Sequence, residues 1–130
     1  MLRTMKKTAV ALVALATLAT STAALAQNAG SPPPRAWLQC RACHTTKANE
    51  PDKVGPNLNK VFGSKAGAHR PNFRYSPALK NSGIIWNDRT LDAWLTNPAR
   101  TVPGNRMAFA GIPDAAQRRA LIAWLRTETR

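Results

Sequence analysis

Two cysteines and a histidine lie close together in one short segment of the chain, Cys40-Arg41-Ala42-Cys43-His44. Two thiols three positions apart, followed at once by an imidazole, form the spacing that attaches a c-type haem. On a helix, positions i, i+3 and i+4 share one face, so the three side chains would point the same way. The sulfurs could then reach the two vinyl groups of a porphyrin and the imidazole its iron. The segment therefore predicts one covalent haem c, attached through Cys40 and Cys43 and ligated by His44.

Three other uses of paired cysteines compete with haem attachment. Two cysteines in an oxidising compartment can form a disulfide, but a bridge across two intervening residues closes a very small loop and stabilises little. A thioredoxin-like redox pair requires a βαβ context, which the sequence does not show. A zinc site needs four ligands, and His44 and the distant His69 are the histidines available beside the thiols. Haem attachment is the interpretation that explains why His44 follows Cys43 directly.

A second axial ligand would suit an electron carrier, because a six-coordinate iron changes little on oxidation. Met107 lies downstream of the motif, in a segment (101–109) that also contains Pro103 and Gly104. Proline and glycine keep this segment out of a helix, so it can cross the far face of the haem as a strap. A thioether ligand favours ferrous iron, and we predict Met107 as the second metal ligand rather than a gap-filling core residue. His69, in a loop rich in Arg, Pro and Gly, is expected to be solvated.

The elements that must position these residues are predicted to be short helices around a long irregular segment. Helices are expected from about 34 through the motif, over 76–83, from 87 or 88 to 96, and from 114 onward. Their N-cap candidates are Ser76, Asn87 or Asp88, and Asp114, and the last helix carries an apolar stripe of Ala120, Leu121, Trp124 and Leu125. Residues 45–75 contain too many prolines and glycines for a helix, and so long a loop is expected to wrap something. The prediction is a small all-α domain.

The first 26 residues are typical of a secretory signal peptide. Three basic residues near the start precede an uncharged stretch over 8–26, which ends in Ala24-Leu25-Ala26. The alternative is an uncleaved membrane anchor, although this Ala- and Thr-rich stretch is only marginally long enough to span a bilayer. We therefore expect cleavage after Ala26 and a periplasmic location.

Cleavage would leave a flexible lead-in over 27–34 and one domain over 35–130, with no further segment that approaches a membrane span. The count of Lys and Arg falls from 19 to 16 when three are removed, against six Asp and Glu, so the formal charge becomes +10. About a hundred residues are near the lower limit for a self-sufficient apolar core. A covalently held planar cofactor would supply part of that core.

These motifs, in this order, resemble the class I cytochromes c, nearest in layout to the mitochondrial type and its bacterial periplasmic relatives. The resemblance covers nearly all of residues 40–130 and implies the small cytochrome c fold, with short helices and long loops wrapped around one covalent haem. Gly55-Pro56-Asn57-Leu58 is similar to the loop that follows the haem motif in this family. There the carbonyl of Pro56 would accept a hydrogen bond from the second nitrogen of His44, which fixes the ring's tautomer and orientation.

The resemblance implies further cofactor-binding residues. Tyr75 and Trp86 would donate their O–H and N–H groups to a buried haem propionate, since a buried carboxylate needs such partners. Either aromatic could instead be a plain core residue. Asn105 belongs to the strap that leads to the methionine ligand and is counted with the cofactor-binding set. The chain departs from the family pattern before the motif, where Ala36 holds the place of an aromatic, so the first helix is expected to be short, with Trp37 as the substitute aromatic.

The predicted function is that of a soluble, monomeric, single-haem electron carrier of a bacterial periplasm, not an enzyme and not a nucleic-acid-binding protein. Its cationic surface is expected to dock on acidic patches of redox partners. The residues expected around the exposed haem edge are Arg41, Lys53, Arg100 and Arg106. Two alternatives stay open: a peroxidase-like haem enzyme or gas-binding protein, which needs an open iron site, and a dedicated cytochrome subunit of one dehydrogenase.

Overall fold

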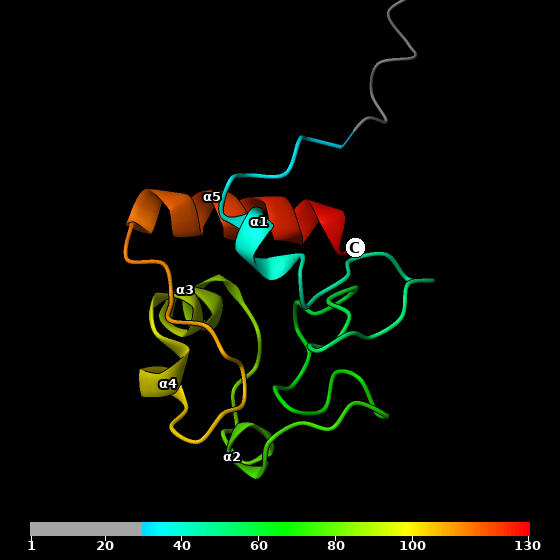
Figure 1. Cartoon of the computed structure of the whole chain (residues 1–130), viewed down its shortest axis with the longest axis vertical. Helices are drawn as coiled ribbons and strands as arrows, with labels where there is room; N and C mark the ends of the chain where they lie inside the picture. The colour runs from blue at the N-terminus through cyan, green and yellow to red at the C-terminus, as the bar shows by residue number, and fades with distance from the viewer. Residues whose placement is uncertain (1–29) are drawn as a thin grey trace, which may run out of the picture.

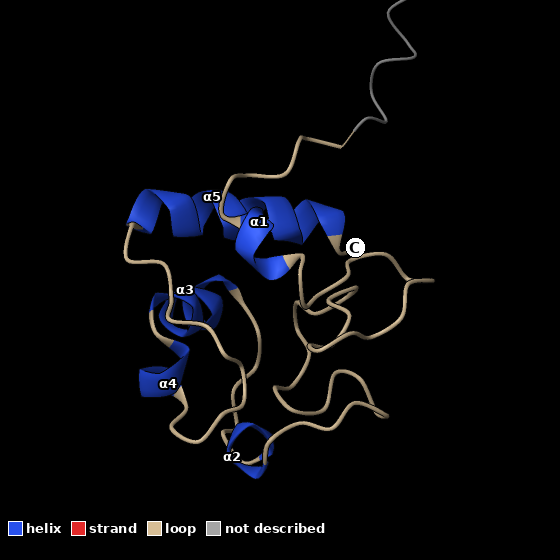
Figure 2. Ribbon diagram, viewed as in Figure 1, coloured by secondary structure: helices blue, strands red, loops and turns tan. Residues whose placement is uncertain are grey.

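The computed structural model describes residues 30–130, so the predicted signal peptide and the start of the lead-in lie outside the described residues. The described part contains the helices α1 (Trp37–Cys40), α2 (Pro77–Lys80), α3 (Asp88–Thr96), α4 (Pro98–Thr101) and α5 (Ala115–Glu128), joined by long loops (Figure 1). Apart from one isolated antiparallel bridge between Lys65 and Ile85, residues 30–130 form helices, turns and loops (Figure 2). The all-α architecture agrees with the prediction.

The two longest helices, α3 and α5, pack against each other and form one side of the core. α5 begins where Asp114 Oδ1 accepts a hydrogen bond from the N–H of Gln117 at 2.8 Å. The apolar side chains that α5 buries are Leu121, Ile122, Trp124 and Leu125. Ala120, which was expected in this stripe, is exposed. The buried face of α5 therefore differs from the predicted one: it includes Ile122, next to Leu121 and Leu125, and not Ala120.

A buried arginine joins α5 to α3 and to the chain that leads into α5. Arg118 Nε lies 2.8 Å from a carboxylate oxygen of Asp92 on α3. The same guanidinium donates to the carbonyl oxygens of Ile112 and Pro113, both at 2.9 Å. Because a buried guanidinium needs such partners, this network fixes where the segment after α4 meets α5.

Side-chain caps define the starts of the three middle helices. Ser76 Oγ accepts from Leu79 N–H at 3.1 Å before α2, and Asn87 forms a reciprocal capping box with Thr90 before α3. Asn97 ends α3, as predicted, and at once caps the short helix α4, which the sequence did not predict. From residue 102 to the start of α5 the chain is non-helical; this segment is called the strap below.

The first helix is short, as expected, and ends at Cys40 in the middle of the predicted motif helix. The helical turn nevertheless continues, because the N–H groups of Cys43 and His44 both donate to the carbonyl of Cys40, at 3.0 and 2.9 Å. Trp37 anchors this turn on α5, since its ring centroid lies 5.0 Å from that of Trp124. The motif is therefore held against the main helix of the fold.

One fully buried asparagine organises the first half of the long irregular segment. Asn57 Nδ2 donates to the carbonyls of Lys47 and Glu50, at 2.7 and 2.9 Å, and its Oδ1 accepts from Asn59 N–H at 2.7 Å. A buried amide with all these partners stabilises a loop that has no helix or strand of its own. The ordered loop brings the residues that precede Asn57 against the haem motif.

Candidate haem site

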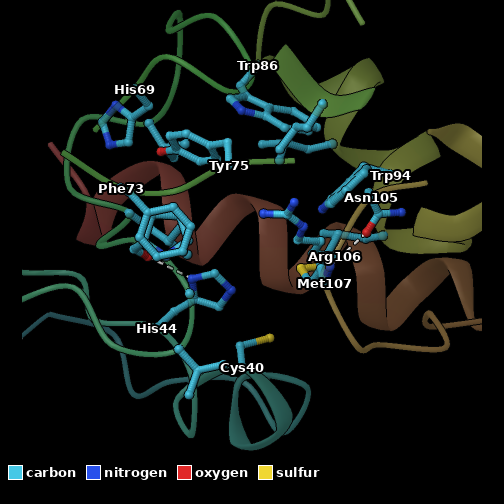
Figure 3. A pocket seen from close by; sticks show the side chains of 18 of the residues that line it. Cys40, His44, His69, Phe73, Tyr75, Trp86, Trp94, Asn105, Arg106 and Met107 are labelled. Carbon is cyan, nitrogen blue, oxygen red and sulfur yellow. Dashed lines mark hydrogen bonds between the residues drawn. The ribbon is translucent and has the colours of Figure 1, made fainter. Parts of the chain in front are cut away.

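A predominantly apolar cavity lies at the centre of the fold, between the helices and the irregular segment (Figure 3). Its helical lining consists of Trp37 and Cys40 from α1, Leu79 from α2, Leu91, Trp94 and Leu95 from α3, and Leu121 and Leu125 from α5. The irregular segment and the strap supply the remaining walls, including His44 and Met107. The lining thus comes from both ends of the domain, as expected of a chain that wraps a cofactor.

His44 has a fixed orientation at one wall of this cavity. Its Nδ1 donates a hydrogen bond to the carbonyl oxygen of Pro56 at 2.7 Å. The backbone of Gly55 lies against the ring: a Cβ at this position would lie 2.4 Å from Cε1 of His44 and 2.8 Å from each ring nitrogen. With Nδ1 carrying the proton toward Pro56, Nε2 keeps its lone pair for a metal.

The environment of the motif also sets its protonation. Burial lowers the pKa of His44, a tendency to which Lys53 adds and which the Pro56 hydrogen bond opposes. A neutral imidazole, the form that binds metal, is therefore the stable one. Burial, with the nearby Cys43, raises the pKa of the Cys40 thiol to about 11. Both cysteines are half-buried free thiols, and Cys40 Sγ is 3.7 Å from the carbonyl oxygen of Ala36.

Met107 faces His44 from the opposite side of the cavity (Figure 3). The strap that carries it is held by Asn105, whose Nδ2 donates to the carbonyls of Pro98 and Val102, both at 2.9 Å. The Oδ1 of Asn105 accepts from the N–H of Met107, also at 2.9 Å. Asn105 itself lines the cavity, so its amide both closes the turn after α4 and fixes the backbone of Met107.

Tyr75 and Trp86 line the end of the cavity away from Cys40 (Figure 3). The Tyr75 hydroxyl accepts from Arg70 N–H at 3.1 Å, and its ring makes an edge contact with Phe73 at a centroid distance of 4.9 Å. Burial raises the pKa of Tyr75, so the hydroxyl keeps its proton and can act as a donor. Trp86 is buried and makes an edge contact with Trp94 at 5.4 Å.

The cavity collects most, but not all, of the predicted site residues. Cys40, His44, Pro56, Tyr75, Trp86, Asn105 and Met107 line it, whereas Cys43 lies beside the lining, at the end of the motif turn. His69, which was expected to be solvated, lines the cavity and has its Nε2 buried. The sequence did not predict that His69 lines the cavity, because the composition of its loop suggests exposure. The loop folds around the cavity and brings His69 into its wall.

These observations test whether the residues present fit a haem. The walls are mainly apolar, the imidazole of His44 and the thioether of Met107 face each other, and the thiol of Cys40 lines the edge beside His44. The missing side chain at Gly55 is required for the imidazole to lie where it does. The donor set of one imidazole and one thioether is suited to haem iron. The residues therefore fit the group.

Comparison with known proteins places the chain in a family. It is 46% identical over 92 residues to cytochrome c2 of Rhodomicrobium vannielii, covering 71% of this chain and 73% of that protein. It is 45% identical over 97 residues to cytochrome c2 iso-1 of Magnetospirillum molischianum, covering 73% and 95%. Cytochrome c of Arabidopsis thaliana is 42% identical over 92 residues, covering 71% and 81%. No family model matches the chain.

A solved structure gives the same result. Cytochrome cH from Methylobacterium extorquens superposes with a TM-score of 0.67 at 41% identity, covering 71% of this chain and 91% of that one. The chain belongs to the class I c-type cytochromes. As a member of that family it carries one covalent haem c and acts as a single-haem electron carrier. Within residues 30–130, none of the helices has the length and apolarity needed to cross a membrane.

Proposed function

We propose that His44 and Met107 are the two axial ligands of the haem and that Cys40 and Cys43 form the thioether bonds. The observation that carries this proposal is the hydrogen bond from His44 Nδ1 to Pro56 at 2.7 Å, because it directs the unprotonated Nε2 into the cavity that Met107 faces. When bound, the haem supplies a one-electron couple between ferrous and ferric iron.

The protein's own groups would keep that couple simple. The Pro56 carbonyl holds the imidazole in one tautomer, and the amide of Asn105 holds the Met107 backbone, so neither ligand needs to move between oxidation states. The mainly apolar walls would disfavour water beside the iron, which limits competing oxygen ligands. Tyr75 and Trp86 are proposed to donate hydrogen bonds to a haem propionate at the other end of the cavity. These roles suit electron transfer and not catalysis.

The spectrum of the purified holoprotein tests the ligands directly. We expect the weak far-red band of methionine-to-iron ligation in the oxidised form, and slow or absent carbon monoxide binding in the ferrous form. Met107→Ala should abolish the band and allow carbon monoxide to bind. Met107→His should also abolish the band, but should still exclude carbon monoxide. An unmodified protein that lacks the band and binds carbon monoxide readily would favour the peroxidase-like or gas-binding alternative.

We further propose that the carrier docks on acidic surfaces of its redox partners through the face around the motif. Val54 lines the cavity and is 83% exposed, so it marks an opening of the site to solvent. Lys53 adjoins it, and its Nζ donates to the backbone carbonyl of Arg41 at 2.6 Å, so both exposed residues lie near this opening. Arg106 lines the cavity from the strap. Arg100 lies on α4 and does not line the cavity.

Rates of electron transfer with an acidic partner test this docking surface. We expect the second-order rate constant to fall steeply as ionic strength rises, because screening weakens attraction between exposed charges. At low salt Lys53→Gln should slow the reaction, whereas Arg119→Gln on α5 should leave it nearly unchanged. A rate constant that does not depend on salt, or that falls equally for both variants, would contradict electrostatic docking at this opening.

We propose that the carrier is monomeric and lies in the periplasm, with residues 1–26 removed on export. The composition of the N-terminus supports export. Mass spectrometry of the protein from a periplasmic fraction should give an N-terminus at Gln27 and a mass increased by one haem. Size-exclusion chromatography with light scattering should give a monomer. Stoichiometric co-purification with one dehydrogenase would favour the dedicated-subunit alternative.

A further inference from the structure

A second hollow lies beside the haem cavity, and three cations line it. Arg74 comes from the irregular segment, Lys80 from the end of α2, and Arg106 from the strap. Phe73 and Tyr75 line both hollows and form a wall between them, and Arg74 and Arg106 also reach both. The second hollow differs from the haem cavity in being mostly polar. Its chemistry is therefore that of an anion site and not of an apolar cofactor pocket.

Two of these cations project from backbone that is fixed by neighbouring contacts. Arg74 lies between Phe73 and Tyr75, whose rings make an edge contact and whose backbones are joined by a hydrogen bond from Tyr75 N–H to the Phe73 carbonyl at 3.1 Å. Lys80 closes the turn of α2, with its N–H donating to the Ser76 carbonyl at 3.1 Å. Both residues are exposed, but their backbones are held on two sides of one hollow.

The third cation is held in the same way by the strap. Arg106 lies between Asn105 and Met107, and the Asn105 Oδ1 accepts from Met107 N–H at 2.9 Å. The strap also touches α2, since a Cβ at Gly104 would lie 3.3 Å from the Cβ of Ala78. The strap and α2 therefore form adjoining walls, and Arg106 and Lys80 line the same space.

The chain's own carboxylates do not neutralise this cluster. All six acidic residues lie within the described part of the chain, and each is engaged elsewhere. Asp52, Asp88, Asp92 and Glu128 pair with Arg70, Arg126, Arg118 and Lys47, Glu50 accepts two backbone N–H groups, and Asp114 caps α5. Within residues 30–130, therefore, no acidic side chain lines the second hollow or forms an ion pair with its three cations.

We propose that the second hollow binds a small, soluble phosphate-bearing anion. Guanidinium groups bind phosphate oxygens through two parallel hydrogen bonds, and a lysine adds a compact point charge. Like charges around one hollow repel one another, so an anion with two or more charges both forms charge-assisted hydrogen bonds and relieves that repulsion. A diphosphate matches three cations better than a single monovalent ion does.

Binding at this hollow would also act on the cofactor, because Arg74 and Arg106 line both hollows. A negative charge placed beside the haem stabilises ferric iron relative to ferrous iron, so the reduction potential should fall when the anion is bound. By linkage, the ferric protein should bind the anion more tightly than the ferrous protein, by the factor that corresponds to this fall in potential. This second effect rests on the proposed haem site, whereas the binding itself does not.

Titration of the ferric holoprotein with inorganic pyrophosphate, at constant ionic strength in chloride, tests the proposal. Calorimetry should give saturable binding of one pyrophosphate per chain. Arg74→Gln and Lys80→Gln should each weaken the affinity by about tenfold or more, the lower end of what one charge-assisted hydrogen bond contributes. Both substitutions avoid the residues next to Met107. Arg119→Gln, which removes an exposed arginine of α5 outside the hollow, should leave the affinity unchanged, and the reduction potential should fall in pyrophosphate.

Three results would overturn the proposal. Absence of saturable binding to the folded holoprotein would mean that the three cations are only solvated or serve the haem's own carboxylates. Equal weakening by all three substitutions would mean that pyrophosphate responds to net charge and not to this hollow. Vesicles of phosphatidylglycerol distinguish the source of the phosphate: binding to vesicles without any response to pyrophosphate would assign the cluster to a membrane surface and would also overturn it. Electron-transfer rates without pyrophosphate report the proposed function separately.

Discussion

The backbone of Gly55 lies in direct contact with the imidazole of His44, so that a Cβ at position 55 would lie 2.4 Å from Cε1 of the ring. Carbon atoms in contact normally lie at least about 3.5 Å apart. The ring has little room to retreat, because its Nδ1 is bound to the Pro56 carbonyl at 2.7 Å. The glycine therefore sets the position of the candidate iron ligand through space and not through backbone flexibility.

Gly55→Ala should displace the His44 ring and weaken or lengthen its bond to the iron. We expect altered visible and magnetic spectra of the oxidised protein, together with a changed reduction potential. Gly83→Ala is the matched control, since Gly83 has a φ of +71° and a Cβ added there would meet no atom within 4 Å. It should cost about 1 kcal/mol of stability through backbone strain without altering the spectra. If both variants gave identical spectra, the loop would accommodate the added methyl group at position 55 without displacing the imidazole of His44.

Asn105→Ala should destabilise the strap and the Met107 ligand together. The substitution removes two donated hydrogen bonds and one accepted hydrogen bond, each 2.9 Å long. We expect a loss of about 2 kcal/mol in the free energy of unfolding and earlier disappearance of the far-red band on warming. Asn72→Ala, at an exposed position, should change neither quantity. A band as heat-resistant as in the unmodified protein would show that the strap holds Met107 without this amide.

Replacing both attachment cysteines by alanine should produce a chain that does not fold cooperatively. The core residues Leu91, Trp94 and Leu121 all line the haem cavity, so without the cofactor much of the apolar interior has no partner. A domain of about a hundred residues has little stability to lose. Far-ultraviolet circular dichroism should show loss of most of the helical signal. A sharp thermal transition in this variant would contradict the role of haem as part of the core.

The pH dependence of stability should contain a contribution from His69. Burial and the nearby Arg70 lower the pKa of His69 below its ordinary value of about 6.5. As pH falls through that value, the unfolded chain takes up the proton before the folded protein does, so the folded state loses stability. Denaturant unfolding at pH 7.5 and pH 5 should therefore show a smaller acid-induced loss in His69→Gln than in the unmodified protein. Equal losses would show that the buried Nε2 is protonated without cost.

Local sequence signals predicted the starts of α2, α3 and α5 well because their causes are local. Ser76, Asn87 and Asp114 each accept a backbone N–H at the start of a helix, and this depends only on residues three positions away. The apolar spacing also predicted that α5 would present a buried face. Which side of α5 is buried, with Ala120 exposed and Ile122 buried, depends on packing against α3 and could not be predicted from the sequence of the helix alone.

The cysteines, the histidine that follows them and the downstream methionine were enough to predict the cofactor, its attachment and its proposed ligands. Covalent and coordinate chemistry requires particular side chains, and particular side chains are visible in a sequence. The tertiary structure decided which surroundings the side chains meet: the contact of Gly55 with His44, the burial of the Nε2 atom of His69, and the gathering of Arg74, Lys80 and Arg106 around one hollow. These surroundings depend on the way in which long loops without regular periodicity fold over a cavity. That folding is determined by contacts between residues far apart in the chain, which no local sequence pattern reveals.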